Sequence, residues 1–194
     1  MEKHIRLAND PAGREVQCAS LDTILNYRRI SHRLATAGQP DRRQLALLAP
    51  SGFETVINLL PATADHALPD EESIVRSLGM DYIHIPVPWT RPTARHLEAF
   101  CDCLDAHCGR LVFIHCAANY RVSVFLALYR IRRLGWQHDR ALRDMHRIWM
   151  PNPVWQRFID RTLGMERRIA RDPQCASRPR EIRRRIFYPS PPMG

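Results

Sequence analysis

The sequence predicts an α/β protein whose central, mostly parallel sheet has four or five strands flanked by helices. Two observations support this fold class. Short apolar runs alternate along the chain with longer amphipathic segments, and this alternation favours parallel strands with helices on both faces of the sheet. The chain also has 194 residues, 45% of them hydrophobic, which is enough for one packed domain with extensions.

The chain is expected to have three parts. Residues 1–30 are polar and mixed and form an N-terminal extension, residues 31–172 form the domain, and residues 173–194 form an arginine- and proline-rich arm. The arm lacks an amphipathic period, which is typical of an extended or partly disordered segment. We expect it to be solvated, or to contact an acidic partner or another subunit.

Three runs, at 54–61, 81–89 and 109–116, are predicted to be strands. The first is rich in β-branched residues and ends at Pro61, and the third is predicted to be fully buried. Residues 33–40, RLATAGQP, form a shorter apolar piece that ends in a Gly-Gln-Pro turn.

Helices are predicted between and after these strands, with ends set by residue chemistry. Asp41 and Thr93 are expected N-caps, and Gly52 and Gly79 are expected C-terminal stops. The helical segments are 41–52, 69–79, 92–107, 121–135, 137–149 and 152–172. The segment 121–135 is strongly apolar, so we expect it to be central.

The formal net charge is +9, from 29 Lys and Arg against 20 Asp and Glu. This excess favours phosphorylated or otherwise anionic partners, or reflects only solvated arginine faces. The sequence gives no firm sign of nucleic-acid binding or membrane insertion. The first residues lack the apolar core of a secretory signal, so we expect a cytoplasmic protein.

Cys101, Cys103 and Cys108 fall within one predicted helix, near His107. Zinc sites usually draw their ligands from two separated pairs. We therefore expect no metal here, and expect Cys101 and Cys108, seven residues apart, to share a helix face and pack as small apolar groups.

The stretch LVFIHCAANYRVS, residues 111–123, is the strongest indication of chemistry. Cys116 ends the third strand and the chain then enters a helix, and ligands of α/β proteins gather where strands end in this way. Backbone N–H groups of such a turn, with the helix dipole, bind anions and stabilise a thiolate. Cys116 is thus the predicted nucleophile. The predicted phosphate-binding residues are Ala117, Ala118, Asn119, Tyr120 and Arg121.

Side chains around the loop have expected roles. Arg121 is predicted to bind phosphate oxygens through its planar fork. Ser123 is expected to donate a hydrogen bond to the sulfur and ease its departure, and His115 to orient the loop from behind. Trp89 is expected to line the pocket, while Tyr120 either shapes the pocket or faces solvent.

Further blocks stand out at 36–40 (TAGQP), 52–59 (GFETVINL), 82–89 (YIHIPVPW) and 148–159 (IWMPNPVWQRFI). With HCAANYRVS at 115–123, they resemble the cysteine-dependent protein tyrosine phosphatase superfamily, and within it the small bacterial dual-specificity-phosphatase-like proteins. The resemblance implies hydrolysis of phosphate monoesters, phosphotyrosine or similar, through a phosphocysteine intermediate without metal or other cofactor. It implies a phosphorylated protein or a small phosphate monoester as the substrate.

The loop departs from that superfamily's pattern, H-C-x5-R-S/T. Only four residues separate Cys116 from Arg121, and Val122 occupies the usual Arg position, while Ser123 keeps its place. A shift of one residue at a helix start rotates a side chain by roughly 100°, which directs Arg121 away from the phosphate unless the loop is reshaped. Asn119 stands where Gly is usual, and Asn tolerates positive φ.

A second departure concerns the general acid. The superfamily supplies an Asp from the loop after the preceding strand, but PVPWTRPT at 86–93 contains no Asp or Glu. Thr90 stands about where the acid is expected. Asp65, Asp70 and Glu72, on a neighbouring loop, are the open alternatives.

Three functions follow from these observations. The first is a cysteine-based phosphatase. The second is a catalytically weak or inactive relative, a pseudophosphatase, that binds phosphorylated or anionic partners. The third is a rhodanese-like sulfur transferase, against which the His-Cys start of the loop and Ser123 argue.

Overall fold

The computed structural model describes residues 20–169, so the expected 173–194 arm and residues 1–19 of the expected extension lie outside the described residues. Five strands form one sheet in the order β1-β2-β5-β3-β4. They are β1 (Arg28–Ser31), β2 (Leu34–Ala37), β3 (Thr55–Asn58), β4 (Asp81–His84) and β5 (Val112–His115). Only the pairing of β1 with β2 is antiparallel among the described strands, which confirms the mostly parallel sheet.

The carboxyl ends of the three central strands are level. Ala37 of β2 and Asn58 of β3 both lie opposite His115 of β5. Side chains that end or follow these strands therefore meet at one edge of the sheet. The apolar piece predicted at 33–40 contains one of these strands, β2, which is fully buried beside β5.

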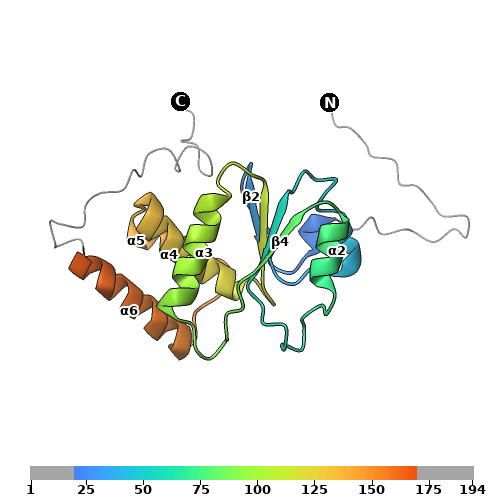
Figure 1. The fold of residues 1–194 in the computed structure, drawn as a ribbon. Coiled ribbons are helices and arrows are strands. Elements are labelled where there is room, and N and C mark those ends of the chain that lie inside the picture. The colour runs from blue at the N-terminus through green and yellow to red at the C-terminus, as the bar shows by residue number, and fades with distance from the viewer. Residues whose placement is uncertain (1–19, 170–194) are drawn as a thin grey trace, which may run out of the picture.

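Helices cover both faces of the sheet. They are the short 3-10 helix η1 (Leu21–Thr23) and α1 (Arg42–Ala46), α2 (Glu71–Ser77), α3 (Ala94–Ala106), α4 (Tyr120–Leu134), α5 (His138–His146) and α6 (Pro153–Ile169). Figure 1 shows α3, α4, α5 and α6 on one side of the sheet and α2 on the other. None of the helices in the described part of the chain is long and apolar enough to cross a membrane.

The predicted helix ends agree with the structure at Asp41, Thr93 and Gly79, but the helix predicted at 41–52 ends earlier, at Ala46. Asp41 accepts from Gln44 N at 2.8 Å, and the Gln44 side chain accepts from Asp41 N at 2.9 Å, which is a capping box. Thr93 accepts from His96 N at 3.3 Å at the start of α3. Gly79, directly after the C-cap of α2, has a φ of 80°, the conformation in which glycine ends a helix. Gly52 also has a positive φ, 87°, but it closes the turns that follow α1 and does not end the helix.

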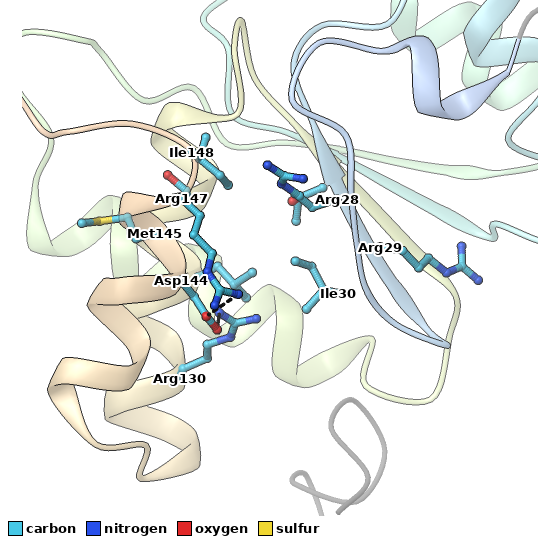
Figure 2. Close-up of a pocket in the computed structure, with 11 residues that line it drawn as sticks. Arg28, Arg29, Ile30, Arg130, Asp144, Met145, Arg147 and Ile148 are labelled. Atoms are coloured by element: carbon cyan, nitrogen blue, oxygen red, sulfur yellow. Dashed lines mark hydrogen bonds and ion pairs between the residues drawn. The ribbon is translucent and has the colours of Figure 1, made fainter. Parts of the chain in front are cut away.

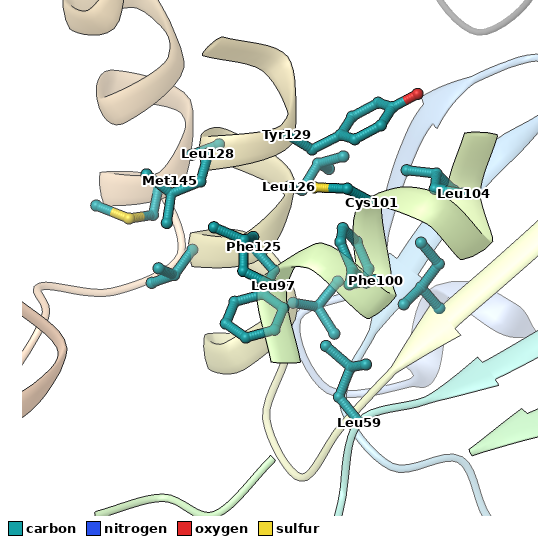
Figure 3. Close-up of a cluster of buried hydrophobic side chains, with 14 of the residues drawn as sticks. Leu59, Leu97, Phe100, Cys101, Leu104, Phe125, Leu126, Leu128, Tyr129 and Met145 are labelled. Carbon is teal, nitrogen blue, oxygen red and sulfur yellow. The ribbon is translucent and has the colours of Figure 1, made fainter. Parts of the chain in front are cut away.

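The larger core cluster lies between the sheet and the helices α3 to α6. Figure 3 shows Phe100 of α3 beside Phe125 and Tyr129 of α4, with the first two rings edge to face at 5.6 Å. Every residue of α4 from Arg121 to Ile131 is buried, which agrees with the central position expected of this helix.

The helical cysteines belong to this core. Cys101 is fully buried, and burial raises the pKa of its thiol to about 12. Burial likewise raises the pKa of Cys103 to about 11. Both thiols therefore stay protonated near neutral pH. Within residues 20–169 no group of three His, Cys, Asp or Glu side chains is placed to hold a metal ion.

The folded unit begins before the boundary expected at residue 31. Ile24 is 2% exposed and packs in a second core cluster with Leu45 of α1 and Val75 of α2. β1 adds an edge strand to the sheet, although its residues are polar or only partly buried. The stretch LDTILNYRRI, residues 21–30, is compatible with a short strand or a turn of helix, and the structure contains both, β1 and η1.

Gly38 is the point where the end of β2 meets the loop after β5. A Cβ at this position would lie 2.8 Å from the carbonyl oxygen of Ala117 and 3.0 Å from that of Leu25. Both are backbone atoms, so neither can yield as a side chain would. We expect Gly38→Ala to lower the free energy of unfolding by about 1–3 kcal/mol, as overpacking does, measured by urea denaturation.

Gly109→Ala is the matched control, because nothing lies within 4 Å of a Cβ at Gly109. Its stability should be unchanged or raised by up to about 1 kcal/mol, through the reduced entropy of the unfolded chain. Equal effects of the two substitutions would show that the approach of β2 to the loop is not close.

Candidate active site

The loop from Cys116 to Asn119, between β5 and α4, is tied to the β1–β2 side of the sheet by its carbonyl groups. The oxygen of Ala117 accepts from Gln39 N at 3.0 Å, and that of Ala118 accepts from the Asn26 side chain at 3.0 Å. Across the described residues, by contrast, the backbone N–H groups of 117, 118 and 120–122 donate no hydrogen bond. The loop thus offers donors without partners at the positive end of the α4 dipole.

Asn119 supplies the turn from the loop into α4. Its φ is 63° and it is the N-cap of the helix, so Asn takes the positive φ for which it was expected to be suited. Its side chain is buried and donates to Asn26 O at 2.8 Å and to Thr36 Oγ1 at 3.0 Å. Asn119 therefore anchors the loop to the turn before β1 and to β2, and any contact it makes with an anion is through the backbone.

A hollow of about 1050 Å³ lies over this loop. Its walls include four residues of the loop and helix start, several apolar side chains and two polar ones from the loop before α2. These are Ala117, Ala118, Tyr120, Arg121, Leu25, Leu60, Leu68, Trp89, Asp65 and His66. Cys116 itself is fully buried at the end of β5, directly before the residues that line the hollow.

Arg121 lines the hollow despite its early position in the loop. Its Nε donates to the carbonyl of Val87 at 2.9 Å, and its guanidinium carbon lies 5.1 Å from the centre of the Trp89 ring. Both partners belong to the segment after β4, which draws the side chain back to the site. The terminal nitrogens of Arg121 have no hydrogen-bond partner among residues 20–169, so they can bind an anion.

Ser123 is placed differently from the expectation. Its hydroxyl donates to Tyr120 O at 2.8 Å and accepts from Trp149 Nε1 at 3.1 Å. The expected bond to the Cys116 sulfur is absent from the hydrogen bonds of the described chain. The reason is local, because a serine in a helix readily bonds to a carbonyl of the preceding turn. Ser123 thus connects the start of α4 to Trp149.

Aromatic rings form one wall of the hollow. Tyr120 stacks on Trp149 at 4.6 Å with an interplanar angle of 9°, and Trp89 lies 5.4 Å from both Trp149 and Trp155. Trp155 is fully buried in the core, and its Nε1 donates to Trp89 O at 3.0 Å. Trp89 and Tyr120 face the hollow, and the other two rings support them.

His115 is held from behind the loop by a buried carboxylate. Glu71, in the first turn of α2, is 2% exposed, and its Oε1 lies 2.6 Å from Nε2 of the fully buried His115. Gln39 donates to the other oxygen at 2.7 Å, and Asn58 lies 3.4 Å from Oε1. Burial and then the nearby Glu71 raise the pKa of Tyr82, which accepts from Asn58, to about 12.

Of the acids named from the sequence, only Asp65 reaches the hollow. Asp70 pairs with Arg42 at 2.6 Å and Glu72 with Arg76 at 2.9 Å. Thr90 is exposed and does not line the hollow. His66, which the sequence reasoning missed, does so beside Asp65. A lone histidine in a loop has no spacing pattern by which it could have been found.

The family of phosphatase-like domains of beta-lactamase hydrolase-like proteins matches residues 26–132. A beta-lactamase hydrolase-like protein of Agrobacterium fabrum (strain C58 / ATCC 33970) is 35% identical over 103 residues. The match covers 52% of this chain and 24% of that protein, so the chain spans about a quarter of the length of this curated relative.

Solved structures show the same fold. A "putative phosphatase (DUF442)" from Shewanella putrefaciens CN-32 is 33% identical with a TM-score of 0.66, and the match covers 75% of this chain and 95% of that one. P. aeruginosa TpbA in complex with pTyr is 20% identical with a TM-score of 0.59, covering 80% of this chain and 96% of that one. At that identity the likeness shows the fold alone.

The Glu71 carboxylate should be a main determinant of stability. Glu71→Ala leaves the donors of His115 and Gln39 buried without their acceptor, and removing one partner of a buried pair typically costs about 3–5 kcal/mol. We expect a loss of that size in urea denaturation. Glu71→Gln keeps one acceptor and should lose about 1–3 kcal/mol.

Glu72→Ala tests the neighbouring position on the same helix turn. The Glu72 side chain is 60% exposed and pairs only with Arg76 among the described residues. An exposed pair of this kind contributes about 0.3–0.5 kcal/mol, so stability should hardly change. Equal losses for Glu71→Ala and Glu72→Ala would contradict the buried role of Glu71.

Proposed function

Since the chain belongs to the family of phosphatase-like domains of beta-lactamase hydrolase-like proteins, we propose that it is a cysteine-based phosphatase of aryl phosphate monoesters such as phosphotyrosine. One observation carries the proposal. The unpartnered N–H groups of the loop and the Arg121 guanidinium belong to the same hollow, beside Cys116. Such a set of donors complements a phosphate group.

In the first step the Cys116 sulfur attacks phosphorus and the bond from phosphorus to the leaving oxygen breaks. The loop N–H groups and the terminal nitrogens of Arg121 hold the remaining phosphate oxygens, where charge develops in the transition state. The leaving oxygen departs with its electron pair and takes a proton. The product is a phosphocysteine and a phenol.

In the second step a water molecule attacks the phosphocysteine. The bond from sulfur to phosphorus breaks, the thiolate returns, and inorganic phosphate leaves. The group that gave its proton in the first step takes one from the water. Ser123 supports this cycle indirectly, because its bonds to Tyr120 O and Trp149 hold the first turn of α4.

We further propose that the proton comes from the loop before α2, where Asp65 and His66 line the hollow next to each other. This loop replaces the segment after β4, in which Thr90 offers no acid. Asp65 and His66 are both exposed, so either side chain can turn towards a leaving oxygen without breaking a packed contact.

The walls of the hollow favour an aromatic leaving group. The hollow that Arg121 lines also has apolar surface from Leu25, Leu68, Trp89 and Tyr120. The rings of Trp89 and Tyr120 can pack against the aromatic ring of a substrate. The pTyr held by the structurally similar TpbA is a ligand of this shape.

The second candidate is a relative that binds phosphate monoesters without turning them over. Two observations favour it. Cys116 is 0% exposed, and the Ser123 hydroxyl is engaged by Tyr120 O and Trp149. Both leave the sulfur with less access and less support than a nucleophile needs.

Hydrolysis of p-nitrophenyl phosphate separates the two candidates. Cys116→Ser should reduce turnover to background while retaining vanadate binding. Arg121→Ala should lower kcat by about 10²–10³-fold, as loss of a transition-state donor does, and Arg121→Lys should lie between, because Lys lacks the planar fork. Arg95→Ala removes an exposed arginine outside the hollow and should have no effect. Absence of turnover in the wild type, with retained vanadate binding, establishes the binder instead.

The proton donor is found by varying the leaving group. With phenyl phosphate, whose leaving group is poor, Asp65→Asn or His66→Gln should lower kcat by about 10²–10⁴-fold, the usual size of general-acid assistance. With 2,4-dinitrophenyl phosphate the same substitution should have little effect, because that phenolate leaves without a proton. Thr90→Ala should change neither rate. The assignment fails if neither variant distinguishes the two substrates.

A further inference from the structure

A second hollow, of about 490 Å³, lies between β1, α4 and α5. It shares no lining residue with the hollow over the loop. Figure 2 shows Arg130 and Arg147 converging on Asp144, with Arg28 of β1 nearby. We call it the arginine hollow, after Arg28, Arg130 and Arg147.

The charges around the arginine hollow do not balance. Asp144 lies 3.1 Å from Arg130 and 3.6 Å from Arg147. Arg28 forms no ion pair within residues 20–169. Four arginines and one aspartate line the hollow. The guanidinium of Arg29 lies against the Phe53 ring, so the other three arginines and Asp144 leave two positive charges in excess at the walls.

Arg29, the next residue of β1, also lines the hollow, but its side chain points to the other face of the sheet. Its guanidinium carbon lies 5.2 Å from the centre of the Phe53 ring, and Figure 2 shows its side chain pointing away from the other labelled residues. Successive side chains of a strand alternate between the faces, so Arg28 and Arg29 carry the same charge to opposite sides. Of these two residues, only Arg28 therefore directs its guanidinium into the hollow.

The remaining walls are mainly apolar, from Ile30, Leu126, Met145 and Ile148, with two buried hydroxyls. One hydroxyl is that of Thr36, which accepts from the Asn119 side chain, and the other is that of Ser123. Both residues hold the catalytic loop or the helix start after it, so the arginine hollow lies directly behind the candidate active site.

We propose that the arginine hollow binds the dianionic phosphate group of a small organic molecule, at a site separate from the substrate site. Two positive charges in excess match a phosphate dianion. Arginine forks suit phosphate oxygens, and the apolar wall takes an organic group. The volume of the hollow falls within the range of small-molecule pockets, about 300–1,000 Å³. A ligand there contacts the residues that position the catalytic loop.

Calorimetry and amide NMR shifts on the Cys116→Ser protein test this proposal, because that variant turns over no ligand. Inorganic phosphate and butyl phosphate are titrated separately at constant ionic strength. We expect two binding sites for butyl phosphate, one of which shifts the amides of Thr36 and Ser123. Adding Arg28→Ala and Arg147→Ala should weaken that site about 10- to 100-fold, as loss of charged hydrogen bonds does. Adding Arg29→Ala should leave it unchanged.

The two probes distinguish a free phosphate ligand from an organic one. If inorganic phosphate binds the arginine hollow more tightly than butyl phosphate does, the proposal that the ligand is an organic phosphate is overturned. Equal weakening by Arg28→Ala and Arg29→Ala would show that the hollow attracts anions only through its overall positive charge. Acetate that binds as tightly as butyl phosphate would show the same. Binding of an acidic peptide in preference to both phosphates would replace the proposal by a protein partner.

The result is independent of the proposed function. Adding Arg121→Ala to the Cys116→Ser protein should abolish only the site over the loop. In the Cys116→Ser protein with Arg121 in place, binding at the arginine hollow without binding over the loop would count against the phosphatase alone. The reverse pattern would count against the arginine hollow alone.

Discussion

The contact between Glu71 and His115 fixes the place at which the site is built. A buried carboxylate is stable only where donors surround it, and here they come from Gln39 after β2, Asn58 at the end of β3 and His115 at the end of β5. These strands are neighbours in the sheet. One side chain of α2 thereby aligns three strand ends, and the residue that follows His115 is the proposed nucleophile.

The sequence predicted much of this fold and part of this site. The individual strands, the caps at Asp41 and Thr93 and the positive φ at Asn119 follow from local chemistry, because each depends on residues close in the chain. The role of Glu71 could not be predicted from local chemistry, because an acidic residue at a helix start is ordinarily exposed. Its burial depends on three strand ends that only the fold brings together.

Arg121 and Ser123 show how a local argument can be incomplete. Moving an arginine by one position does rotate it about the helix, yet the side chain is long, and the Val87 carbonyl and Trp89 ring retain it. Ser123 occupies its usual place in the pattern, but its hydroxyl bonds to the carbonyl of Tyr120. Spacing predicts where a Cα lies. Partners from elsewhere in the chain decide where the polar atoms go.

The segment after β4 is fastened at two successive points. The carbonyl of Val87 accepts from Arg121 and that of Trp89 accepts from Trp155, while the Trp89 ring is packed against its aromatic neighbours. A swinging flap at this position would have to break both bonds and unstack the rings on every cycle. The site therefore stands preassembled on this side, so an incoming molecule spends little of its affinity on ordering it. Asp65 and His66, which line the same hollow and are exposed, are by contrast free to adjust to that molecule.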